Sequence, residues 1–175
     1  YLPTGADDSQ ASFNDGRVGT AYIQELRFNK YCERLQALVT EVFDDMLSRS
    51  IPDYEGMRRT TTELAVRFAQ TDTDIVDLGC SRGAALKPIM QELGTYHYSY
   101  LGMEISEPML EAAKKELPDA DIFWFDLRDD FPSVISSVTL SVLTLQFIPI
   151  EYRQKIIQNV YDSLVEGGAF LFVEK

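Results

Sequence analysis

The sequence predicts an α/β fold: a Rossmann-like, doubly wound and mainly parallel sheet with helices on both faces, preceded by an N-terminal helical extension. The chain has 175 residues, of which 45% are hydrophobic and 25% charged, which suits one globular domain with a genuine core. From residue 72 onward, short apolar runs alternate with segments of helical spacing. Such alternation is typical of parallel strands joined by helices that cover the sheet.

The strands and helices can be placed along the chain from these patterns. Apolar runs predict strands over residues 74–79, 98–105, 120–127, 137–147 and 167–175. Helical spacing predicts helices over residues 60–70, 84–94, 107–117 and 150–164. The threonines at 60–62 are expected to cap the first of these helices, and Ser106 the third.

The N-terminal part of the chain has a different composition. Residues 1–20 are rich in Gly, Asp, Ser and Thr without periodicity, which predicts a poorly ordered arm. In residues 22–49 apolar side chains recur at helical spacing, and we interpret this stripe as core or subunit contact rather than cofactor contact. We therefore expect an arm over 1–20, a helical extension over 21–71, and an α/β domain over 72–175 that lacks the usual strands after its fifth.

Composition also excludes several classes of function. No stretch approaches the roughly 18 to 20 apolar residues of a membrane span, and the first ten residues lack the blocks of a signal peptide, so a cytoplasmic protein without a membrane partner is expected. Cys32 and Cys80 show no paired Cys/His spacing, which argues against a metal site. The net charge of −12 disfavours direct nucleic-acid binding.

Residues 79–83, which follow the first strand, allow two kinds of chemistry. The letters Gly-Cys-Ser-Arg-Gly match G-x-S-x-G, the turn that exposes a nucleophilic serine in α/β-hydrolases. That fold needs an acid and then a histidine downstream of Ser81. The only histidine, His97, comes before the next strand, and no acid intervenes at a strand end. A hydrolase is therefore a distant alternative.

A cofactor site explains the same loop together with the later strand ends. In an open parallel sheet the ligand lies beyond the carboxyl ends of the strands, where Asp77, Gly79, Glu104 and Asp126 are predicted to lie. Gly79 and Gly83 permit close approach of the backbone, and a helix beginning near Gly83 would offer free N–H groups to a carboxylate or phosphate.

The strand-end acids suit an adenosine that carries an anionic tail. Glu104 has two acceptor oxygens for the two hydroxyls of a ribose, Asp126 can accept from an adenine amino group, and the Leu127 N–H can donate to the ring. NAD is less favoured because Ser81 occupies the second glycine position of G-x-G-x-x-G. Each acid alone could also cap a helix or face water.

Several segments resemble the ordered motifs of class I S-adenosylmethionine-dependent methyltransferases over about residues 72–175. They are DLGCSRGAAL, GMEIS, FDL, LTLQF and LVEGGAFLFVEK. With the upstream EVFDDMLSRSIPDYEGM, the chain is similar, over roughly residues 33–175, to the bacterial carboxy-S-adenosylmethionine synthase family, which serves wobble-uridine modification of tRNA.

This resemblance implies a set of cofactor contacts and two departures. Tyr54 would close over the cofactor; the methionine moiety would meet Gly79, Cys80 and Ser81, the ribose Glu104 and Ile105, and the adenine Asp126 and Leu127. Val142 stands where the synthase family usually has an asparagine, and Glu104 stands where it usually has aspartate. The family's arginine for the carboxylated cofactor has no counterpart in these 175 residues, so the resemblance does not carry the synthase activity over.

The sequence thus leads to three hypotheses. The first is a methyltransferase that uses S-adenosylmethionine on an unidentified acceptor, with Tyr54 and Gln146 as orienting groups, because aligning acceptor and methyl group requires no general base. The second is a carboxy-S-adenosylmethionine synthase using prephenate, whose cofactor would be carboxylated. The third is a non-catalytic cofactor-binding or assembly module, such as a homodimer, because an exposed fifth strand invites pairing.

Overall fold

The computed structural model describes residues 38–40 and 42–174, and its central feature is one sheet of five parallel strands. The strand order is β3-β2-β1-β4-β5. The strands are β1 (Thr73–Leu78), β2 (Tyr98–Glu104), β3 (Asp121–Trp124), β4 (Ser136–Val142) and β5 (Leu164–Val173). The arm predicted over residues 1–20 and much of the first predicted helix lie outside the described residues.

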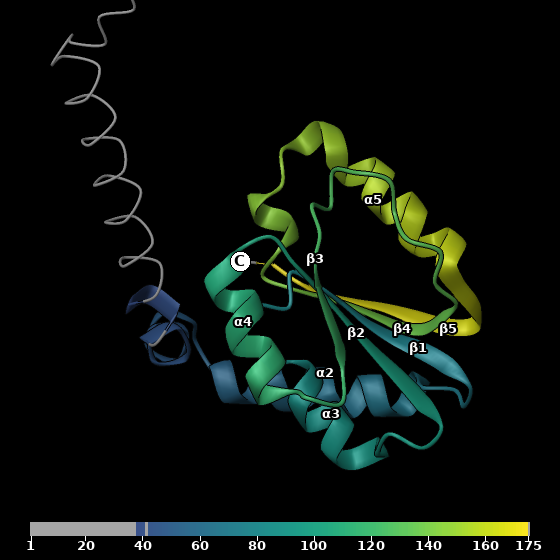
Figure 1. Cartoon of the computed structure of the whole chain (residues 1–175), viewed down its shortest axis with the longest axis horizontal. Coiled ribbons are helices and arrows are strands. Elements are labelled where there is room, and N and C mark those ends of the chain that lie inside the picture. Colours follow the sequence, from purple (N-terminus) through teal and green to yellow (C-terminus); the bar gives the residue numbers. More distant parts are fainter. Residues whose placement is uncertain (1–37, 41, 175) are drawn as a thin grey trace, which may run out of the picture. The chain divides into compact units, whose positions relative to one another are not determined.

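Helices cover both faces of this sheet. They are α2 (Tyr54–Phe68), α3 (Leu86–Leu93), α4 (Glu107–Glu116) and α5 (Ile150–Ser163), with a short 3-10 helix, η1 (Leu145–Phe147), after β4. The first three lie on one face, and α5 lies on the other (Figure 1). The predicted doubly wound α/β fold is therefore confirmed.

Side-chain alternation along the strands divides the core between the two faces. Ile75 packs into the cluster formed with α3 and α4, whereas its neighbour Val76 packs into the cluster formed with α5. Both side chains are fully buried. Successive strand residues point to opposite faces, so strands covered on both sides read as nearly continuous apolar runs. This is why the strands could be recognised in the sequence.

The predicted element boundaries need correction at four places. The third strand ends at Trp124 rather than at residue 127. The helix predicted over 60–70 begins at Tyr54, so the hydroxyls of Thr61 and Thr62 do not cap it but donate to carbonyls one turn earlier. The fourth strand ends at Val142 rather than at residue 147, because Leu143 adopts a φ of 59° and turns the chain out of the sheet. The fifth strand begins at Leu164, directly after α5.

The strand order positions a ligand site. The crossovers from β1 through β3 run along one face, and the connection from β4 to β5 runs along the other. The chain therefore reverses direction between the neighbouring strands β1 and β4. In open α/β sheets this reversal opens a crevice at the carboxyl ends of the strands.

Residues 38–40 and 42–50 are helical and precede a break at residues 51–53. The described residues group into one compact unit, within which α2 contacts α3, β4 and β5. Among the described residues, no helix has the length and apolar character needed to cross a membrane.

Candidate functional site

A cleft of about 730 Å³ lies at the carboxyl ends of the strands. This volume falls within the range of about 300 to 1,000 Å³ typical of small-molecule sites. The structure brings eleven of the twelve predicted site residues to its lining. They are Tyr54, Asp77, Gly79, Cys80, Ser81, Glu104, Ile105, Asp126, Leu127, Val142 and Gln146.

The loop after β1 forms the floor of this cleft in a constrained conformation. Gly79 has a φ of 72°, and a Cβ atom there would lie 2.5 Å from the Thr144 side chain, so only glycine fits. Ser81 also has a positive φ, 49°, which is uncommon for a residue with a side chain. Backbone strain of this kind often accompanies a functional loop.

Backbone hydrogen bonds hold this loop against β2. The N–H groups of Gly79 and Cys80 both donate to the Met103 carbonyl, at 2.8 and 3.0 Å. The Ser81 N–H donates to Oε2 of Glu104 at 2.9 Å. These three donors are therefore used within the protein.

Gly83 is the twelfth predicted residue, and it does not line the cleft. Its N–H donates to the Cys80 carbonyl at 2.7 Å, and α3 begins only at Leu86, so the free amide expected at Gly83 is absent. A Cβ atom at Gly83 would lie 2.3 Å from Leu117 Cδ1. Glycine is required here for close packing of the loop against residues that follow α4.

Glu104 ends β2 with its side chain buried at the cleft. It is 8% exposed. Besides the bond from Ser81, its Oε1 accepts a hydrogen bond from the Ser106 N–H at 2.8 Å. The carboxylate thus joins the loop after β1 to the start of α4. Each carboxylate oxygen has a second lone pair, so two hydroxyl donors can still be accommodated.

Asp77 is a second buried acid beside Glu104. It is 2% exposed, and its Oδ1 has no hydrogen-bond partner among the described residues. Burial, with a smaller contribution from the Glu104 charge, raises its pKa from 3.8 to about 7. An unpartnered buried carboxyl that faces a cleft is costly without a ligand, so a cationic group bound here would be stabilised.

Asp126 lies at the cleft but already has a partner. Its carboxylate accepts from the backbone N–H of Arg128 at 3.0 Å and pairs with the guanidinium of the same residue. These hydrogen bonds are the main cause of its lowered pKa. A ligand amino group that bonds to Asp126 must therefore share this carboxylate with Arg128.

Two further predicted residues are neutral groups. Burial raises the pKa of the Tyr54 phenol, so this hydroxyl stays protonated at neutral pH and can act as a hydrogen-bond donor. Burial also raises the pKa of the Cys80 thiol, which removes the thiolate needed for nucleophilic chemistry. Neither residue is suited to act as a general base near pH 7.

Sequence reasoning missed one wall of the cleft. Phe43, Met46 and Leu47 of the helical segment 42–50 line it, although their stripe was expected to be core or subunit contact. The two arginines of the lining, Arg58 and Arg128, were also missed. Amphipathic spacing alone does not distinguish a cleft wall from core.

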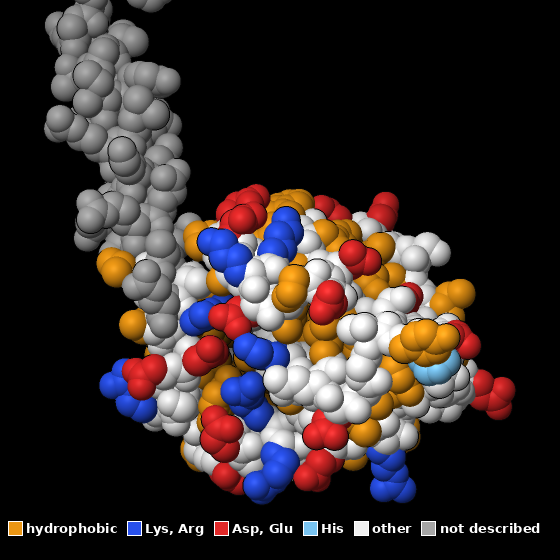
Figure 2. Space-filling model, turned by 60° about the horizontal axis from the view of Figure 1, so that its bottom comes forward, with side chains coloured by type: hydrophobic (Ala, Val, Ile, Leu, Met, Phe, Trp, Pro, Cys, Tyr) orange, Lys and Arg blue, Asp and Glu red, His pale blue; other side chains and the backbone are white. Residues whose placement is uncertain are grey.

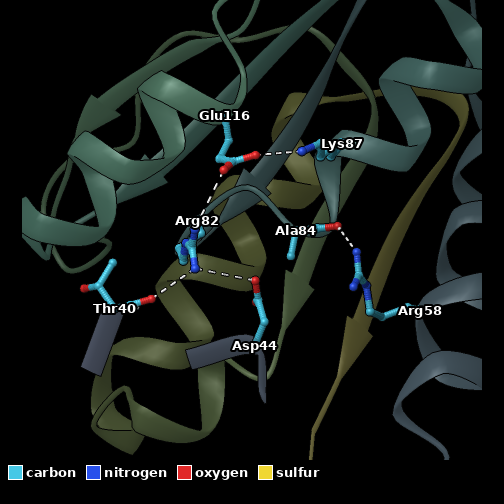
Figure 3. Close-up of polar contacts among 7 residues, drawn as sticks. All are labelled: Thr40, Asp44, Arg58, Arg82, Ala84, Lys87 and Glu116. Atoms are coloured by element: carbon cyan, nitrogen blue, oxygen red, sulfur yellow. Dashed lines mark hydrogen bonds and ion pairs between the residues drawn. The ribbon is translucent and has the colours of Figure 1, made fainter. Parts of the chain in front are cut away.

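Arg82 connects Thr40 and the helical segment 42–50 to the loop after β1 through a hydrogen bond and an ion pair (Figure 3). Its guanidinium donates to the Thr40 carbonyl at 3.2 Å and lies 3.8 Å from an Asp44 carboxylate oxygen. On its other side it lies 3.7 Å from Glu116 at the end of α4, and Glu116 also pairs with Lys87. Arg82 thus connects the loop after β1 with the helical segment 42–50 and with the end of α4.

The geometry does not support a hydrolase. Ser81 follows the carboxyl end of β1, whereas His97 pairs with Asp72 at the amino end. A six-residue strand separates these ends by about 20 Å. Among the residues that the structure describes, no cluster of His, Cys, Asp and Glu could hold a metal ion.

The surface carries charges of both signs. Acidic side chains lie between the basic ones on the face that Figure 2 shows, in keeping with the net charge of −12. A continuous basic surface, which would attract a phosphate backbone, is not formed on that face.

The parallel sheet with a cleft at its switch point places the chain in the class of Rossmann-like α/β proteins, and comparison with known proteins defines its family. A family model described as a methyltransferase domain matches residues 75–168, more than half of the chain. The chain belongs to this methyltransferase domain family. A model of the bacteriophage T4-like portal protein (Gp20) matches residues 1–69.

Curated relatives are named carboxy-S-adenosyl-L-methionine synthase. The protein from Actinobacillus succinogenes is 37% identical over 142 residues, and that from Methylococcus capsulatus is 34% identical over 143 residues. In both cases the match covers 78% of this chain and 59% of the relative. The chain thus spans about three fifths of the length of these relatives. The predicted family resemblance is confirmed.

Solved structures share the fold at lower identity. An S-adenosylmethionine-dependent methyltransferase from Clostridium acetobutylicum gives a TM-score of 0.61 at 18% identity, covering 83% of this chain and 56% of that one. An amino pentose methyltransferase from Micromonospora echinaspora, solved with S-adenosylmethionine bound, gives a TM-score of 0.64 at 15% identity, covering 77% and 56% of the two chains.

Proposed function

We propose that this chain binds S-adenosylmethionine in the cleft and transfers its methyl group to an acceptor. The observation that carries the proposal is the buried Glu104 carboxylate, which lies at the end of β2 beside the loop at Gly79 and faces the cleft. Two hydroxyls of a ribose match its remaining acceptor sites. The proposal keeps the cytoplasmic location that the sequence predicts.

The other lining residues support one orientation of the cofactor. Asp126 and Leu127 follow β3 and would receive the adenine, while Glu104 and Ile105 would receive the ribose. The methionine moiety would then extend over residues 79–81, close to Asp77 and Tyr54. Asp77 lies where a positive group would stabilise its charged form.

The chain's own residues would act by positioning rather than by acid-base catalysis. The bound cofactor would supply a methyl group on a positively charged sulfur: an acceptor lone pair would bond to the methyl carbon as the carbon–sulfur bond breaks, and the sulfur would leave as the neutral thioether of S-adenosylhomocysteine, which requires no invariant base. The Tyr54 hydroxyl and the Gln146 amide, both in the lining, would orient the reactants. Phe43, Leu47 and Phe147 would exclude water from the reacting atoms.

A matched pair of variants tests the cofactor assignment. Glu104→Gln removes the charge of the buried acid, whereas Glu107→Gln removes a charge from the exposed first turn of α4. Calorimetric titration should show S-adenosylmethionine binding weakened about tenfold or more by the first change and unaffected by the second. Equal affinity of both variants and the parent protein would reject the assignment.

A carboxy-S-adenosylmethionine synthase is the second candidate, and the names of the curated relatives favour it. Val142 argues against it, since an apolar side chain replaces an amide that could contact the carboxylated group. The purified protein would be incubated with S-adenosylmethionine and prephenate, and the extracted cofactor weighed by mass spectrometry. A mass increase equal to a carboxyl group would favour the synthase, and an unchanged cofactor would reject it.

An assembly role is supported by a different observation. β5 pairs only with β4 in the described sheet, and Phe172 on this strand is exposed. Long unpaired strand edges favour association with another chain, so we propose that two copies pair. Sedimentation equilibrium should then give a dimer; a monomer at all concentrations would reject this role.

A further inference from the structure

The loop at the floor of the cleft offers few backbone donors to an anion. Gly79, Cys80, Ser81 and Gly83 each donate their N–H to an acceptor within the protein. The acids Asp77 and Glu104 lie beside the same loop, so a carboxylate placed there would face their carboxyl oxygens rather than a cation. The α-carboxylate of an S-adenosylmethionine placed over this loop therefore needs a cation from elsewhere in the protein.

Of the residues that the structure describes, two arginines line the cleft, and they differ in whether they already have an anionic partner. Arg128 pairs with Asp126 at the end proposed for adenine. Arg58, on α2, forms no ion pair with any carboxylate of residues 38–40 or 42–174. Arg58 is partly buried. A partly buried cation without a counter-ion gains free energy when it binds an anion.

Hydrogen bonding also leaves Arg58 oriented for a ligand (Figure 3). Its Nη2 donates to the Ala84 carbonyl at 2.9 Å, just beyond the loop. Its Cζ atom lies 5.7 Å from the centre of the Tyr54 ring. A guanidinium has five N–H donors in a planar fork, so donors remain for both oxygens of a carboxylate.

We infer that Arg58 binds the α-carboxylate of S-adenosylmethionine and thereby selects cofactors that carry an intact amino-acid group. This inference rests on the proposed function, because it assumes that the methionine moiety lies over residues 79–81. The arrangement then matches charges along the cleft. The ammonium and sulfonium groups lie close to Asp77, Glu104 binds the ribose hydroxyls, and the carboxylate meets Arg58.

Decarboxylated S-adenosylmethionine is the probe that isolates this contact, since it lacks only the α-carboxylate. Calorimetric titration of the parent protein should show S-adenosylmethionine bound about tenfold to a hundredfold more tightly than the decarboxylated compound, the usual effect of a charge-assisted hydrogen-bonded pair. Arg58→Met should abolish this preference by weakening only the carboxylated ligand. Arg58→Lys should restore part of it.

Arg59→Met is the matched control, because Arg59 is the next residue of α2, is exposed and does not line the cleft. It should retain the full preference. If Arg58→Met weakens both ligands equally, the arginine acts only through Ala84 and the inference is wrong. If Arg58→Met keeps the preference, another group holds the carboxylate and the inference is equally wrong. If the parent protein binds neither ligand, the proposed function itself fails.

Discussion

At the scale of single residues, Asp126 distinguishes an adenosine site from a chance grouping of acids. Its carboxylate should accept a hydrogen bond from the adenine amino group, a charge-assisted bond that contributes roughly 1.5 to 3 kcal/mol. Asp126→Ala should therefore weaken S-adenosylmethionine by about tenfold to a hundredfold in a calorimetric titration. Asp126→Asn should lose less, since its amide oxygen still accepts.

Three further variants control this experiment. Asp129 and Asp130 are exposed and lie outside the cleft lining, so their alanine variants should bind like the parent protein. Arg128→Ala frees the Asp126 carboxylate of its present partner and should leave binding equal or tighter. An Asp126→Ala variant with parental affinity would show that the end of β3 does not hold adenine.

Asp77 should make stability depend on pH in an unusual direction for an acid. Its pKa is raised in the folded state from 3.8 to about 7, so the folded protein holds this proton more tightly than the unfolded chain. The stability it contributes is fully present below pH 3.8 and is lost as the pH rises through about 7. A difference of one unit between the pKa values of the folded and the unfolded state corresponds to about 1.4 kcal/mol of stability.

Urea unfolding at pH 5 and pH 8 measures this effect. Relative to Asp77→Asn, the free energy of unfolding of the parent protein should fall by at least about 1 kcal/mol between these values. The exposed Asp119 provides the control variant Asp119→Asn, which should follow the parent protein. Identical pH dependence of the parent and Asp77→Asn would contradict the raised pKa.

At the scale of elements, Arg82 should decide how firmly the helical segment 42–50 is held. Its bond to Thr40 and its contact with Asp44 are partly exposed, so each contributes on the order of 1 kcal/mol or less. Arg82→Leu should therefore speed hydrogen exchange in residues 42–50 by about fivefold or more and leave β1 and β2 unchanged.

Lys87→Leu is the control for this change, because Lys87 shares the Glu116 partner but makes no hydrogen bond or ion pair with residues 38–40 or 42–50. Faster exchange in both variants would assign the effect to Glu116 and α4. Unchanged exchange in Arg82→Leu would show that packing of Phe43 and Leu47, rather than Arg82, holds the segment.

The strands and most helices could be predicted because their apolar periodicity is strong. The end of β4 could not, since the run of apolar residues continues past Val142 while the backbone turns at Leu143. The start of α2 was missed because Pro52 and Gly56 are residue types that commonly interrupt helices, yet Gly56 lies within this helix. Tertiary packing overrides local sequence preferences of this kind.

At the scale of the whole molecule, the order of the strand-end residues predicted the cleft, because parallel strands present their carboxyl ends at one edge. Eleven of the twelve predicted site residues line it. Gly83 does not, and Arg58 and Arg128 were missed, because a periodic pattern does not reveal which face of α2 or which loop side chain turns inward. The wall from residues 43–47 likewise depends on tertiary contacts.

The central claim is that S-adenosylmethionine and its product occupy this cleft. Hydrogen-deuterium exchange of the intact chain with and without saturating S-adenosylhomocysteine tests it most directly. We predict slower exchange at three segments: residues 79–83, 104–106 and 126–128. The amino ends of the strands, including residues 95–98, should not change. Unchanged exchange in all three segments at millimolar ligand, or protection confined to another surface, would contradict the account.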